Sequence, residues 1–360
     1  MKKTLLALAV LGASAGVASA QQSNVTVYGI VDAGVQYKND GNPAGKTLSL
    51  ESGQQNGSRL GFKGTEDLGG GLSAIFTLEN GFNVDDGTLG QGSRLFGRQA
   101  WVGLNGGFGT VKLGRQQTAL YYALDAIDPF RINLAGNAQK VFGAGQYATD
   151  PLSRSNNTVS YSTATIGGFT GSASYGFGEV AGNNSAGRTV GAGGTYVNGP
   201  VNVQLVYQKS NTAPVVGALT TALGVPSTTT APATADVSTA FVGATYDFRV
   251  VKAHLAYANT KFNLTTTSVK DNDILIGVTV PLTSADNVLA SYIHNDVKDL
   301  TAAKSNQFAL GYTHALSART SLYTSAAYLK NDSSIGVNTG TNAPLGSNVR
   351  IFNVGMRHMF

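Results

Sequence analysis

Residues 201–208 read VNVQLVYQ, and apolar side chains alternate there with polar ones. One face of an extended chain would carry Val201, Val203, Leu205 and Tyr207. This period of two is typical of a β-strand with one apolar face. The same alternation recurs at 273–280 and 307–314, and comparable segments follow one another from Asn24 onward. The chain is therefore expected to be all-β.

The apolar faces could pack against each other in a soluble β-sandwich, or they could face lipid. Two features favour lipid. The segments are long enough to cross a bilayer at a tilt, which requires about 9–11 residues. Aromatic residues also gather near segment ends, as in the girdles of membrane barrels. They are Tyr28, Tyr37, Tyr175, Phe177, Tyr207, Tyr246, Phe248 and Tyr328.

The connections between segments alternate in length. Short turns rich in Gly, Asn and Asp are predicted at 67–70, 105–107, 166–168, 198–200, 247–249, 282–286 and 316–319. Longer polar links are predicted at 38–56, 83–93, 117–153, 179–187, 210–236, 262–270, 296–304 and 331–346. Seven turns and eight loops join sixteen strands. An even number lets an antiparallel transmembrane β-barrel close without an unpaired edge, and sixteen leaves an aqueous channel.

The beginning of the chain predicts export. Lys2 and Lys3 precede the apolar run 4–10, and the small residues 18–20 follow, so residues 1–20 are expected to be a signal peptide and 21–360 the barrel. The charged fraction is only 12%, and beyond residue 20 no run approaches the ~20 apolar residues of a membrane helix. The formal net charge of +5 includes two signal lysines, and it does not suggest a nucleic-acid partner.

Five sequence motifs follow one another along the chain. They are VYGIVDAG at 27–34, GSRLGFKGTEDLGGG at 57–71, GRQAWVGL at 97–104, FGTVKLGRQ at 108–116 and VGMRHMF at 354–360. In these motifs the chain resembles the trimeric general porins of Gram-negative bacteria, particularly the β-proteobacterial branch. The resemblance implies a homotrimer in the outer membrane, in contact with lipid and lipopolysaccharide. It also implies passive diffusion of small hydrophilic solutes and ions, without a cofactor or catalysis.

The resemblance also implies a pore constriction, because these porins fold their third loop inward, and here that loop is 117–153. Its expected acids are Asp125 and Asp128, and the expected wall cations are Arg59, Arg98 and Arg154, with Arg115 and Lys63 as weaker candidates. Alternation places Arg59 and Lys63 on the face opposite Leu60, toward the lumen. For Arg98 the alternation is ambiguous, because Ala100 and the apolar residues after it share its parity.

Opposed charges across a narrow aqueous neck create a transverse field, which orients dipolar solutes and disfavours apolar ones. Arginine suits such a wall because its guanidinium stays charged beside like neighbours. The loop lacks the Pro-Glu-Phe-Gly-Gly sequence of the enterobacterial porins and carries Arg131 directly after Phe130. The added positive charge predicts a weak preference for anions.

The last segment ends on an aromatic residue. One alternating face carries Phe352, Val354, Met356, His358 and Phe360. In the porins that this chain resembles, such an ending is a signal read by the barrel-assembly machinery. A second interpretation, compatible with the first, is a terminal strand that closes the barrel against the first strand.

Three alternatives remain. A substrate-specific channel would carry a row of aromatic residues along its lumen or a binding site in its loops. A barrel enzyme would need a clustered nucleophile, histidine and acid, but the four histidines, His254, His294, His314 and His358, are scattered, and no cysteine is present. An exported soluble β-sandwich, such as an adhesin, would stay in solution without detergent.

Overall fold

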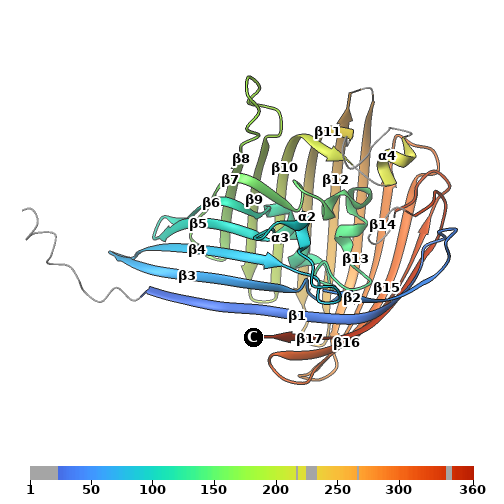
Figure 1. Ribbon diagram of the computed structural model, residues 1–360, viewed down its shortest axis with the longest axis horizontal. Helices are drawn as coiled ribbons and strands as arrows, with labels where there is room; N and C mark the ends of the chain where they lie inside the picture. The colour runs from blue at the N-terminus through green and yellow to red at the C-terminus, as the bar shows by residue number, and fades with distance from the viewer. Residues whose placement is uncertain (1–22, 216–217, 224–232, 266, 338–342) are drawn as a thin grey trace, which may run out of the picture.

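The computed structural model describes residues 23–215, 218–223, 233–265, 267–337 and 343–360. Within these residues the strands form a 17-stranded sheet that curls into a barrel (Figure 1). The predicted signal peptide, residues 1–20, lies outside the described residues. No helix in the described part of the chain is long and apolar enough to span a membrane.

The strands are β1 (Ser23–Asn39), β2 (Thr47–Ser52), β3 (Arg59–Gly69), β4 (Leu72–Gly81), β5 (Gln99–Gly106), β6 (Gly109–Gln117), β7 (Arg154–Ser162), β8 (Phe169–Gly176), β9 (Thr189–Asn198), β10 (Val201–Val215), β11 (Ala233–Asp247), β12 (Lys252–Leu264), β13 (Ser268–Pro281), β14 (Asp286–Val297), β15 (Lys304–Ala315), β16 (Thr320–Asn331) and β17 (Val349–Met359). The helices are α2 (Gly90–Ser93), α3 (Ala119–Ile127), α4 (Ala218–Ala222) and the 3-10 segments η1 (Ala138–Lys140) and η2 (Phe142–Ala148).

The barrel closes where the first and last strands meet. β1 pairs antiparallel with β17, from Ile30 opposite Met359 to Asn39 opposite Arg350. On its other edge β1 pairs with β2 over one half and with β3 over the other. β2 and β3 are therefore two pieces of one barrel strand, and the predicted antiparallel barrel of sixteen strands is confirmed.

The break between β2 and β3 has a local cause. The carboxylate of Asp32 on β1 accepts N–H groups of Gln55 and Asn56 at 2.9 and 2.6 Å. Its other oxygen accepts the hydroxyl of Tyr323 at 2.6 Å. This buried carboxylate holds residues 55 and 56 outside the ladder, between β2 and β3. Part of the predicted loop 38–56 is a strand, β2, because residues 47–52 pair with β1.

The alternation at 201–208 separates two environments, as predicted. Leu205 and Tyr207 are 53% and 51% exposed on the outside, whereas Gln204 and Gln208 are 8% and 1% exposed on the polar face. Because strands pair around a closed ring, backbone N–H and C=O groups find partners within the sheet, as hydrocarbon requires. Lipid can therefore wet the outer face.

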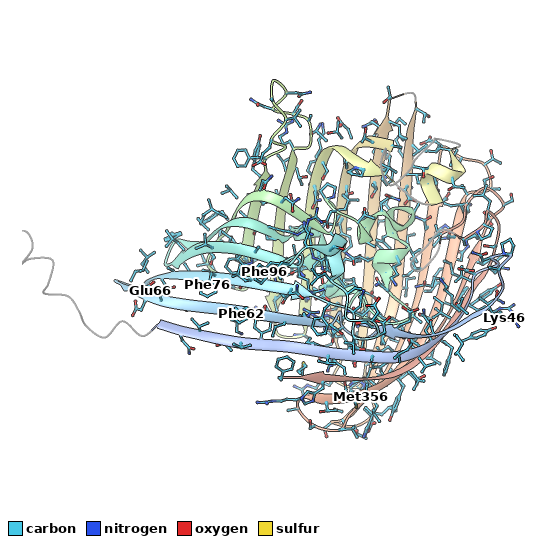
Figure 2. The ribbon with its side chains drawn as sticks, viewed as in Figure 1. Lys46, Phe62, Glu66, Phe76, Phe96 and Met356 are labelled. Atoms are coloured by element: carbon cyan, nitrogen blue, oxygen red, sulfur yellow. The ribbon has the colours of Figure 1, made fainter. Side chains whose placement is uncertain are left out.

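The short turns and longer loops lie at opposite ends of the strands. Figure 2 places Glu66 near the end of the barrel that carries the short turns, and Lys46 near the end that carries the longer loops. Two predicted loops are shorter than expected, since β10 and β11 extend into 210–236, and β12 and β13 extend into 262–270. Their polar residues still pair, for example Asn263 with Ser268, because backbone groups gain from pairing outside the bilayer too.

Candidate pore constriction

The helix α3 follows β6 directly and begins with a capping residue. The Thr118 hydroxyl accepts the N–H of Tyr121 at 3.1 Å and donates to the carbonyl of Leu152 at 2.6 Å. It thus ties the start of the segment 118–153 to its end. The buried face of α3 carries Leu120, Ala123, Leu124 and Ile127, and it packs against β9, β10, β11 and β12. A ring nitrogen of His254 meets the carbonyl of Ile127 at 2.6 Å and anchors the helix end.

Beyond α3, the segment crosses to distant strands. The N–H of Ala135 donates to the Ser325 hydroxyl on β16 at 3.0 Å, and the N–H of Gly143 donates to Asp273 on β13 at 2.8 Å. The Tyr147 hydroxyl lies 2.8 Å from a hydroxyl on β12. These contacts lie on the polar face of the strands, opposite the exposed apolar face.

Asp128, one of the two predicted loop acids, lies inside the segment. Its carboxylate is fully buried and accepts the N–H groups of Phe130, Ile132 and Ala138, each at 3.0 Å. Burial raises the pKa of Asp128 to about 7, although the three N–H groups oppose that shift. Asp128 therefore shapes the loop and contributes less negative charge to the lumen than an exposed aspartate.

The other predicted acid, Asp125, is paired within the segment. Its two carboxylate oxygens accept bonds from the Arg131 guanidinium at 3.2 and 2.6 Å. The Arg131 side chain is 67% exposed, so the pair lies at the surface of the segment. The structure thus joins Asp125 to Arg131 and not to the arginines of the wall.

Two of the predicted wall cations, Arg59 and Arg98, meet at one carboxylate. Glu79 on β4 lies 2.7 Å from Nε of Arg98 and 3.9 Å from Nη1 of Arg59. The Tyr28 hydroxyl donates to the same carboxylate at 2.8 Å. Arg98 precedes β5, so its side chain does not follow that strand's alternation, and it lies on the polar face with Glu79.

Arg154, the third predicted wall cation, lies at the start of β7. Its guanidinium lies 5.4 Å from the ring centre of Tyr121 on α3, a cation–π contact. Its buried Nε has no hydrogen-bond partner in the described part of the chain. Arg59, Arg98 and Arg154 thus form a basic wall beside Tyr121. The carboxylate of Glu79 lies within this basic wall.

The two weaker candidates have different surroundings. Arg115 donates from all three guanidinium nitrogens, to Gly97 at 2.7 Å, Asn156 at 2.6 Å and Asp150 at 2.7 Å. It therefore fastens the end of the segment to the wall. Lys63 lies further toward the turn end of β3, with its ammonium 5.4 Å from the ring centre of Tyr28.

Comparison with known proteins decides the family. A family model described as Gram-negative porin matches residues 7–334. The chain belongs to the Gram-negative porins. It is 36% identical to an outer membrane porin protein of Bordetella pertussis over 92% of this chain and 95% of the relative. It is also 36% identical to outer membrane porin protein 32 of Delftia acidovorans, over the full length of both.

A solved structure agrees with these relatives. An anion-selective porin from Comamonas acidovorans superposes with a TM-score of 0.79 at 33% identity, covering 94% of this chain and 100% of that one. The predicted family, its β-proteobacterial branch and an outer-membrane location are thereby confirmed. The porin function rests on the same comparisons.

Sequence reasoning missed two residues that lie beside the porin's basic wall, Glu79 and Tyr28. Glu79 was detectable, since it alternates with Leu78 in β4 and so shares the polar face with Thr77. Tyr28 was predicted in the outer aromatic girdle, which is wrong because its hydroxyl bonds Glu79 on the polar face. Its partner across the ladder is Gly61, whose missing side chain leaves room for the Tyr28 ring.

The C-terminal residues proposed as an assembly signal face outward. Phe352, Val354, Met356 and Phe360 are about half exposed, between 48% and 52%. Phe360 also completes the closure, because Gly29 donates its N–H to the Phe360 carbonyl at 3.0 Å and accepts the Phe360 N–H at 3.1 Å. Recognition by an assembly machinery stays a prediction.

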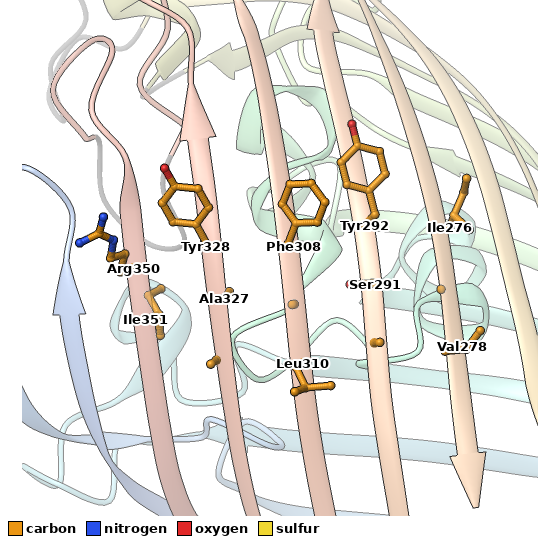
Figure 3. Close-up of a pocket in the computed structure, with 14 residues that line it drawn as sticks. Ile276, Val278, Ser291, Tyr292, Phe308, Leu310, Ala327, Tyr328, Arg350 and Ile351 are labelled. Carbon is orange, nitrogen blue, oxygen red and sulfur yellow. The ribbon is translucent and has the colours of Figure 1, made fainter.

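A separate hollow of about 750 Å³ lies on the outside of the porin (Figure 3). Tyr292, Phe308 and Tyr328 stand side by side above it on neighbouring strands, and Leu310 lies below. These side chains share the lipid-facing parity of their strands. The hollow is therefore a feature of the membrane surface and not of the channel.

Proposed function

We propose that this porin lets small hydrophilic solutes and ions diffuse passively through a neck between the basic wall and the segment 118–153, with a weak preference for anions. The observation that carries the proposal is the charge balance at the neck. Arg59 and Arg98 share one wall carboxylate, Glu79, and Arg154 lies over the ring of Tyr121. The loop adds little negative charge, because Asp125 is neutralised by Arg131.

Net positive charge in a narrow aqueous passage raises the local concentration of anions. A surface charge acts on an ion 4 Å away with about 1 kcal/mol in water, which is about a fivefold change in concentration. This magnitude supports a preference and not an exclusion of cations. The relative described as anion-selective supports the same sign.

Swelling of proteoliposomes in sugars of increasing size tests general diffusion. We expect the rate to fall smoothly with solute size and to depend linearly on solute concentration, because the charges of the basic wall act on any polar solute. A rate that saturates with a single sugar and ignores others of equal size would favour the alternative, a substrate-specific channel.

Three further properties belong to this proposal. We expect residues 1–20 to be removed during export, the porin to associate as a homotrimer, and its outer face to contact lipid and lipopolysaccharide. Support comes from the sequence pattern at the N-terminus and from family membership. A heat-modifiable band of three times the monomer mass in mild detergent would support the trimer.

The family and the fold indicate a channel and not an enzyme. The histidines have separate partners: His294 contacts Asn306, His314 contacts Asp286 and His358 contacts Thr320. His254 contacts the helix α3, as described above. We therefore propose no catalytic role for them.

A further inference from the structure

A cavity of about 500 Å³ lies on the turn side of the segment 118–153, away from the basic wall. Its cations are Lys252 on β12, Arg357 on β17 and Arg131 at the surface of the segment. Lys252 is the first residue of its strand, and Arg357 lies three residues from the C-terminus. Both positions are at the turn end of the barrel, which faces the periplasm in proteins of this class.

The carboxylates near this cavity already have partners. Asp125 is bonded by Arg131 through both oxygens, and Asp128 is buried under three N–H groups. Asp32, which lies opposite Arg357 in the ladder, accepts Tyr323 and two backbone N–H groups. Among the described residues, neither Lys252 nor Arg357 forms an ion pair.

Arg357 supplies an independent sign of a ligand. One of its terminal nitrogens donates to the Asn56 side chain at 2.6 Å, which fixes the direction of the guanidinium. Its Nε is buried and lacks a hydrogen-bond partner within the described ranges. The buried Nε cannot reach a ligand, but the second terminal nitrogen, Nη2, also has no hydrogen-bond partner within the described ranges, and it can donate to an acceptor in the cavity.

From this geometry we infer that Lys252, Arg357 and Arg131 form a second anion-binding site, in series with the neck and on its periplasmic side. The site fits small oxyanions such as phosphate, whose oxygens can accept from a guanidinium and an ammonium at once. It deepens the proposed function, because an anion that leaves the neck would meet a second group of cations before reaching the periplasm.

Inorganic phosphate is the probe. Single channels in a planar bilayer with KCl on both sides receive phosphate in one chamber and then in the other. We expect the chloride current of the unaltered porin to fall saturably with phosphate from at least one chamber. The phosphate concentration that blocks half of the current should rise at least about tenfold in the double variant Lys252→Gln and Arg357→Gln. Charge-assisted hydrogen bonds contribute about 1.5 kcal/mol or more, and this variant removes them.

Lys209→Gln is the matched control, because Lys209 shares the outward face of β10 with Tyr207 and removing its charge leaves the lumen unchanged. Lys252→Gln alone is the second variant, in case the loss of the Arg357–Asn56 bond disturbs folding. Unchanged phosphate block in a folded Lys252→Gln channel, or no saturable block of the unaltered porin, would overturn the second site. An open, anion-preferring channel would still uphold the proposed function in either case.

Discussion

Replacing Arg59, Arg98 and Arg154 together by glutamine is expected to reverse the ion preference of the porin from weakly anionic to weakly cationic. The three guanidiniums are the positive charges of the basic wall, and Glu79 would remain there as an unbalanced carboxylate. At about fivefold per charge in water, the chloride-to-potassium permeability ratio should fall at least about tenfold. Reversal potentials in a KCl gradient measure this ratio.

Two controls make this result specific. Removing three charges outside the neck, by Lys209→Gln, Arg249→Gln and Arg319→Gln, should leave the ratio unchanged, since Arg249 and Arg319 are exposed in turns. Glu79→Gln alone should raise the ratio, because it deletes the carboxylate and keeps the shape of the side chain. A triple arginine variant that keeps its chloride preference would place the source of the field elsewhere.

Deleting Phe360 is expected to reduce the amount of assembled porin more strongly than shortening another outward aromatic residue of the last strand. The deletion removes both backbone hydrogen bonds between Phe360 and Gly29, which join the last residue to the first strand. Two bonds are worth about 2 kcal/mol, so the equilibrium constant for barrel closure should fall by more than about tenfold, and the yield of closed barrel should fall with it. The yield is measured as the heat-modifiable band in outer-membrane extracts.

Phe360→Tyr should assemble normally, because it keeps the backbone bonds and the ring. Phe352→Ala should have a smaller effect than the deletion. Phe352 and Phe360 are equally exposed, at 49%, but Phe352 lies within the strand and its loss leaves the closure intact. Normal assembly after deletion of Phe360 would show that closure does not depend on the final pair.

Sequence predicted the barrel well, because a membrane imposes a strict pattern on strands. Leu205 and Gln204 must face different solvents, and the period of two therefore survives along the whole strand. The same reasoning placed Arg59 on the polar face. It also predicted the number of strands, since the turns at one end are short.

The surroundings of the segment 118–153 could not be predicted in the same way. Outside the ladder no period relates neighbouring residues, and Asp125 and Asp128 look alike in sequence. Only their contacts separate them, because Asp125 meets Arg131 whereas Asp128 turns inward to three N–H groups. The family resemblance also drew attention to loop acids, although the wall carboxylate Glu79 follows the ordinary alternation of β4.

The reversal potential of the purified, unaltered porin tests the central claim most directly. The claim is that hydrocarbon covers the apolar half of each strand and that the polar half encloses water beside a basic wall. In a planar bilayer with a KCl gradient, we predict stable ohmic steps and a reversal potential of the sign set by chloride. A bilayer that stays sealed, or a clear preference for potassium, would contradict it.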